Sequence, residues 1–98
     1  MRNSLDKGIK GEIKMQILSQ SKYSIVNTNN LINISIEKDY REEKEQTIEG
    51  FSIVTLSANE RVRAMLGFFT KKERAQEILL DIYSKLSENK NSYKIPEK

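Results

Sequence analysis

Apolar and polar residues alternate along the middle of this chain in the manner of half-buried β-strands. The clearest stretch runs from Leu31 to Glu37, where every second residue is isoleucine and polar residues stand between them. Because successive side chains of a strand point to opposite faces, such a stretch buries one face and exposes the other. Shorter stretches, separated by turn residues such as Asn, Ser and Gly, predict further strands. The predicted strands cover residues 13–18, 23–26, 31–37, 51–56 and 61–69.

The last of these predicted strands has two different faces. Strict alternation places Val62, Ala64, Leu66 and Phe68 on one face. It places Arg61, Arg63, Met65, Gly67 and Phe69 on the other. Since Met65 and Phe69 accompany the two arginines, the second face exposes apolar area unless something covers it.

After Phe69 the spacing of apolar residues changes to every third or fourth position, which is typical of an amphipathic helix. Thr70 and Glu73 form the Thr-x-x-Glu pattern of a capping box, in which the hydroxyl and the carboxylate bind main-chain amides at the helix start. The polar residues from Ser87 onward, followed by Pro96, predict that the helix ends near residues 87–89. Its apolar stripe consists of Ala75, Ile78, Leu79, Ile82 and Leu86, and Leu80 with Tyr83 widens it.

These elements predict an α+β fold, with an antiparallel sheet of four to five strands and one C-terminal helix packed on one face. The length of 98 residues suits one domain with a single core. We expect a flexible leader over residues 1–12, a single α+β domain over 13–88 and a flexible tail over 89–98. The highly charged stretch Lys38–Glu49 is interpreted as a solvated loop, with an acidic mimic surface as the alternative.

The composition excludes several classes of chemistry. The chain has neither histidine nor cysteine, which removes the usual general base, thiolate catalysis, disulfides and zinc–thiolate sites. The carboxylates of Asp39, Glu42, Glu43 and Glu45 are close in sequence, but no glycine supplies the sharp turn of a calcium loop. Glycine-rich phosphate motifs are absent as well. We therefore expect a protein that is not an enzyme and has no cofactor or metal.

Positive charge is concentrated in the segment from Arg61 to Arg74, although the whole chain carries only a formal +3. Arginines two apart on a strand point to the same face, where they can grip phosphate beside an aromatic ring. The helix start adds further cations beside main-chain amides that attract anions. The alternative is a solvated face on which the arginine stems cover Phe69. The predicted ligand-binding residues are Arg61, Arg63, Phe69, Lys71, Lys72 and Arg74.

Three sequence segments resemble a group of short proteins encoded in phages and prophages of Gram-positive bacteria, most of which have no assigned function. The segments are Met15–Gln20, Asn30–Ile36 and Met65–Leu79. In that group an opening strand ends in Ser-Gln, a later strand ends in Leu-Gly-aromatic, and the helix begins with Glu-(Lys/Arg)-Ala. The resemblance covers Met15 to Leu86, and the chain departs from it in its leader and its charged stretch.

The resemblance implies a mobile genetic element, in which small non-enzymatic proteins commonly neutralise host immunity. We therefore expect an anti-defence inhibitor that occupies a host effector protein or sequesters a nucleotide messenger, as a homo-oligomer. A chain without a membrane-spanning or signal segment is expected in the cytoplasm, that of the host cell if phage-encoded, without a membrane partner. Two alternatives remain open, a single-stranded nucleic-acid-binding accessory protein and a structural component of the virion.

Overall fold

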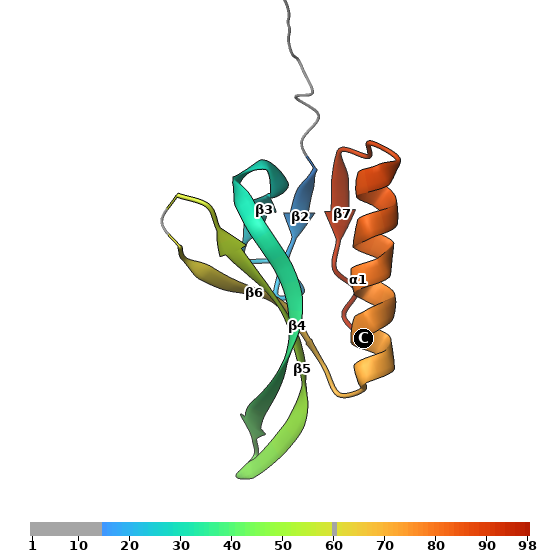
Figure 1. Cartoon of the computed structure of the whole chain (residues 1–98). Helices are drawn as coiled ribbons and strands as arrows, with labels where there is room; N and C mark the ends of the chain where they lie inside the picture. The colour runs from blue at the N-terminus through green and yellow to red at the C-terminus, as the bar shows by residue number, and fades with distance from the viewer. Residues whose placement is uncertain (1–14, 60) are drawn as a thin grey trace, which may run out of the picture.

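The computed structural model describes residues 15–59 and 61–98, which form two three-stranded sheets and one long helix (Figure 1). The α+β class is confirmed, but the prediction of a single sheet of four to five strands is wrong. The expected leader over residues 1–12 lies outside the described residues. The elements are β2 (Gln16–Leu18), β3 (Ile25–Asn27), a short 3-10 helix (Thr28–Asn30), β4 (Leu31–Glu43), β5 (Gln46–Ser57), β6 (Arg63–Phe69), α1 (Lys72–Ser87) and β7 (Ser92–Lys94).

The larger sheet is an antiparallel meander of β4, β5 and β6. Its first two strands extend through the stretch that the sequence predicts as a loop, and the chain reverses between Glu43 and Gln46. Lys44 and Glu45 both have positive φ, at 50° and 66°, as a two-residue hairpin turn of the primed type requires. The charged residues therefore form strand ends that project beyond the helix (Figure 1).

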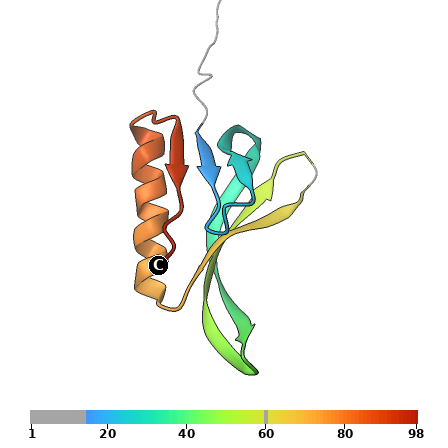
Figure 2. The ribbon, with the colours of Figure 1, turned by 180° about the vertical axis from the view of Figure 1, so that it is seen from behind.

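The smaller sheet joins segments that are far apart in the sequence. β2 pairs antiparallel with β3 and parallel with β7, and Ile17 lies opposite Tyr93. Both views place β7 between β2 and α1 (Figure 1, Figure 2). The amide of Ile95 donates to the carbonyl of Leu18 at 3.0 Å, and the Ile95 side chain is only 1% exposed. Residues 89–98, predicted as a flexible tail, thus contribute a strand and a core residue, which corrects that prediction.

The core lies between the two sheets and α1. The predicted helix stripe supplies three buried residues, Ala75, Ile78 and Ile82. Three other apolar residues that were predicted to belong to the stripe are exposed, namely Leu80, Tyr83 and Leu86. The larger sheet contributes the face that carries Ile53, which is called the inner face below. The buried core cluster consists of Met15, Ile17, Ile53, Leu66, Phe69, Ala75, Ile78, Ile82 and Ile95.

The helix begins without the predicted capping box. Its N-cap is Lys71, which makes no side-chain capping bond, and Thr70 stands outside the helix. The amides of Arg74 and Ala75 instead donate to the carbonyl of Lys71, at 3.1 and 3.2 Å. Thr70 and Glu73 are therefore one residue out of register with the cap and N3 positions that a capping box needs.

A β-bulge in β6 changes which side chains face the core. Ile53 of β5 pairs with Gly67, but the next residue, Val54, pairs with Met65, so Leu66 is the extra residue. Leu66 and Phe69 consequently both enter the core, whereas Phe68 points to the opposite, outer face of the sheet. The strict alternation predicted from the sequence, with Leu66 and Phe68 on one face, is wrong for this reason.

Candidate functional site

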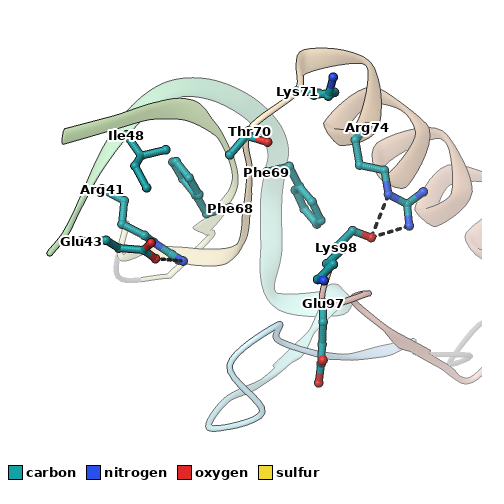
Figure 3. Close-up of a pocket in the computed structure, with 10 residues that line it drawn as sticks. All are labelled: Arg41, Glu43, Ile48, Phe68, Phe69, Thr70, Lys71, Arg74, Glu97 and Lys98. Carbon is teal, nitrogen blue, oxygen red and sulfur yellow. Dashed lines mark hydrogen bonds and ion pairs between the residues drawn. The ribbon is translucent and has the colours of Figure 1, made fainter. Parts of the chain in front are cut away.

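An open groove of about 420 Å³ lies where β6 leaves the larger sheet and turns into α1 (Figure 3). Residues from four parts of the chain meet there: the β4–β5 hairpin, the end of β6, the start of α1 and the segment after β7. The lining residues are Arg41, Glu43, Ile48, Phe68, Phe69, Thr70, Lys71, Arg74, Glu97 and Lys98.

The apolar base of the groove depends on one glycine of β5. A Cβ atom on Gly50 would collide with the ring of Phe68, and it would stand 2.7 Å from the main-chain oxygen of Phe69. Only glycine therefore leaves room for the Phe68 ring against β5 at this point. Ile48 continues the apolar surface on the same side of the hairpin (Figure 3).

Arg41 of β4 covers this aromatic ring. Its guanidinium carbon lies 4.7 Å from the centre of the Phe68 ring, which is a cation–π distance. One guanidinium nitrogen lies 3.8 Å from the carboxylate of Glu43, two residues along the same strand face. The ring and the carboxylate together hold the guanidinium plane at the mouth of the groove.

Arg74 of α1 stands on the other side of the groove with its guanidinium already directed at oxygen atoms. Its Nε and Nη2 atoms donate to the main-chain oxygen of Lys98 at 3.0 and 2.8 Å (Figure 3). Its Nη1 atom donates to Glu77 at 2.9 Å. Two parallel N–H donors of one guanidinium form the fork with which arginine binds carboxylates and phosphates. Lys71 lies at the rim beside it.

Gln20, in the turn after β2, joins the outer edge of β6 to the segment that bears Glu97. Its side-chain oxygen accepts from the amide of Phe68 at 2.9 Å, and its side-chain nitrogen donates to the carbonyls of Phe68, Pro96 and Glu97 at 3.1–3.2 Å. The Gln20 side chain thereby pairs with the amide and carbonyl of Phe68 as a neighbouring strand would, and it fixes one wall of the groove.

Two carboxylates near the groove have pKa values below their ordinary range. Lys22 hydrogen-bonds Glu97 at 2.7 Å and lowers its pKa. Asp39 of β4 accepts hydrogen bonds from the hydroxyl of Ser52 at 2.6 Å and from the amide of Tyr40 at 2.8 Å, and these bonds lower its pKa. Both carboxylates therefore stay ionised to a more acidic pH than free carboxylates do.

The structure brings three of the predicted ligand-binding residues to this groove and leaves three elsewhere. Phe69, Lys71 and Arg74 line it, but Phe69 is only 3% exposed and belongs mostly to the core. Arg63 forms an ion pair with Glu37 on the outer face of the sheet. Arg61 and Lys72 are exposed and do not line the groove.

Sequence reasoning missed Arg41, Glu43, Ile48 and Phe68 for two reasons. The first three belong to the stretch predicted as a loop, and strict alternation puts Phe68 on the same face as Leu66. One signal was present in the sequence: Tyr40 and Ile48 are strand-favouring residues on either side of Lys44 and Glu45, as the two arms of a hairpin have.

Comparisons of the chain with protein-family models, with curated proteins and with solved structures found no match. The resemblance to phage proteins accordingly stays a prediction. The helix in the described part of the chain is too short and too polar to cross a membrane. Within the same described residues, no three acidic side chains gather closely enough to hold a metal ion.

Proposed function

We propose that this protein acts by binding, as a phage-type anti-defence inhibitor that occupies a host immune effector or sequesters a nucleotide signal in the groove described above. The observation that carries the proposal is the guanidinium of Arg41 lying 4.7 Å from the centre of the Phe68 ring, with Lys71 and Arg74 on the opposite side. The resemblance of the sequence to short phage proteins supports the biological setting.

The groove combines the two features that a nucleotide needs. The exposed side of the Arg41 guanidinium is a flat, cationic surface on which a base can stack, as arginine planes do in nucleic-acid recognition. The Nε and Nη2 donors of Arg74 form a fork on the Lys98 oxygen, and an anionic group of the ligand would take the place of that oxygen. A ligand with a flat aromatic part and an anionic part therefore fits better than a purely apolar one.

The chemical inventory of the chain favours binding over catalysis. It contains no histidine and no cysteine, so a reaction would depend on carboxylates, lysines and hydroxyls. Stoichiometric capture of an effector or a messenger requires only complementary shape and charge, and none of the side chains that the chain lacks.

Isothermal titration calorimetry tests the proposal, with AMP, a cyclic dinucleotide and inorganic phosphate as probes. Arg41→Glu should weaken binding of at least one nucleotide probe by roughly tenfold to a hundredfold, because a stacked cation becomes an anion. Arg61→Glu is the matched control, since it makes the same charge change outside the groove. Equal affinities of the two variants, or no binding by the unaltered protein, would contradict the nucleotide form of the proposal.

The effector form has a separate test, because a protein target would be captured without any nucleotide. The unaltered protein should then retain a host protein from infected-cell extract that the Arg41→Glu variant loses and the Arg61→Glu variant keeps. The target is identified by mass spectrometry and the complex is rebuilt from the two purified proteins.

The second candidate function is binding of a single nucleic-acid strand, which the same pairing of arginine with an aromatic ring favours. It predicts that log affinity for an oligonucleotide falls linearly with log salt, in proportion to the phosphates contacted. Against it, Glu37 and Glu43 partly neutralise Arg63 and Arg41. Flat salt dependence would remove this candidate.

A further inference from the structure

The segment of residues 96–98 borders the groove, and side chains from elsewhere in the chain hold its main chain there. The carbonyls of Pro96 and Glu97 each accept a hydrogen bond from the side-chain nitrogen of Gln20 at 3.1 Å. The main-chain oxygen of Lys98 accepts two from the guanidinium of Arg74, at 3.0 and 2.8 Å (Figure 3). Successive main-chain oxygens of this segment are therefore bound by side chains, without the regular pairing of a sheet.

The contact with Lys98 occupies the donors that an anionic ligand would need. The Nε and Nη2 atoms of one guanidinium form a fork with which arginine binds phosphate or carboxylate oxygens. The third nitrogen of Arg74, Nη1, already donates to Glu77 at 2.9 Å. The Lys98 oxygen therefore competes with any anionic ligand for the fork of Arg74.

The interactions that hold residues 96–98 are of a kind that breaks at low cost. Ile95 is buried and anchors the start of the segment, whereas Glu97 and Lys98 are exposed. Glu97 pairs with Lys22 at 2.7 Å, and both side chains of this ion pair are at least half exposed. Exposed ion pairs add little to stability, and segments with few buried contacts open without unfolding of the rest of the domain. Residues 96–98 can therefore leave the groove while Ile95 stays in the core.

We propose that residues 96–98 form a strap that occupies the fork of Arg74 and closes it to anions, and that the ion pair between Lys22 and Glu97 is its latch. The proposal rests on the proposed function in one respect, namely that the ligand of the groove carries an anionic group. Only molecules with an open strap then bind the ligand, so the apparent dissociation constant is the intrinsic one divided by the open fraction. A change that weakens the latch should therefore tighten the binding of an anion.

Lys22→Gln tests the latch with inorganic phosphate as the probe, because the variant sets two effects against each other. Loss of a positive charge weakens anion binding, whereas release of the strap strengthens it. NMR titration, followed on the side-chain N–H signals of Arg74, should show phosphate affinity rising by up to about fivefold, the range expected for one exposed ion pair.

Lys38→Gln is the matched control for this titration. It makes the same charge change and breaks the exposed ion pair with Glu49, and neither residue of that pair lines the groove. The control should therefore show no gain in phosphate affinity. If Lys22→Gln binds phosphate no more tightly than the control, the strap proposal is overturned.

A second measurement follows the strap without any ligand. NMR relaxation of the main-chain amides of Glu97 and Lys98 should give order parameters near the rigid value of about 0.85 in the unaltered protein and in Lys38→Gln. In Lys22→Gln they should fall toward about 0.6, the value of flexible segments. Equal order parameters in all three proteins overturn the proposal.

The strap and the proposed function fail in different ways. Tighter phosphate binding by Lys22→Gln, with no nucleotide bound by either protein, supports the strap and contradicts the nucleotide form of the proposed function. Nucleotide binding that depends on Arg41 but is the same in Lys22→Gln supports the proposed function and overturns the strap.

Discussion

Replacement of Ile95 by alanine tests whether the segment after β7 belongs to the core. Ile95 is 1% exposed, and its amide donates to the carbonyl of Leu18 at 3.0 Å. Its Cγ2 methyl lies against Gly67 of β6, close enough that a Cβ on that glycine would be 3.0 Å away. The side chain therefore contacts the edge of the larger sheet while its main chain extends the smaller one.

The expected cost follows from this burial. Alanine removes three carbon atoms, and burial is worth about 0.8 kcal/mol for each, so transfer alone accounts for roughly 2.4 kcal/mol. The remaining cavity raises the total into the range of about 2–5 kcal/mol. The free energy of unfolding of a natural domain is about 5–15 kcal/mol, so the variant should lose a substantial part of its stability. Each kcal/mol lowers the melting temperature by about 4–8 °C.

Urea unfolding followed by far-UV circular dichroism measures this change. Ile95→Ala should lower the urea midpoint with little change in slope, because the surface exposed on unfolding is nearly the same. Ile95→Val should lose only about 0.5–1.5 kcal/mol, and Lys94→Ala, at an exposed position in β7, should lose almost nothing. If Ile95→Ala behaves like Lys94→Ala, the packing of this segment is refuted.

Two further predictions concern side-chain hydrogen bonds. Gln20→Glu should lower the free energy of unfolding by about 1–3 kcal/mol at neutral pH, because a carboxylate without a donor then faces the carbonyls of Phe68, Pro96 and Glu97. Urea unfolding near pH 4, where the new carboxyl group is partly protonated, should recover part of the loss. An equal loss at both pH values would count against this reasoning. Tyr93 donates to Asp81 at 2.8 Å, and burial together with this bond raises the pKa of Tyr93. A raised folded-state pKa adds stability that is complete below the unfolded value of about 10 and is lost as pH rises. The free energy of unfolding should therefore fall more steeply with alkaline pH in the unaltered protein than in Tyr93→Phe. Identical pH profiles of the two proteins would contradict this.

Local patterns in the sequence were sufficient for much of the secondary structure. The alternation around Ile34 and Ile36 predicted β4, and the change of period after Phe69 predicted α1. Three residues of the predicted apolar stripe, Ala75, Ile78 and Ile82, are buried. These signals are reliable because each records which side chains of one continuous segment meet the core. They led to the α+β class, which the structure confirms.

Contacts between distant segments decided which strands pair and which face of the sheet each side chain occupies. Nothing near Tyr93 or Ile95 reveals that β2, more than seventy positions earlier in the chain, pairs with β7 in parallel. The bulge at Leu66 is defined by the pairing of β6 with β5, so it cannot be read from β6 alone. This bulge places Phe68 on the outer face.

The candidate groove likewise combines residues that the sequence predicted with residues that only the tertiary structure brought to it. The sequence located Phe69, Lys71 and Arg74, which are close together along the chain, but it could not bring Arg41 to Phe68, because that contact depends on hairpin pairing and on the space above Gly50. Hydrophobic period and charge are properties of the chain itself, and the sequence determines them. Sheet partners, bulges and the meeting of side chains in a groove depend on long-range packing, which only the tertiary structure decides.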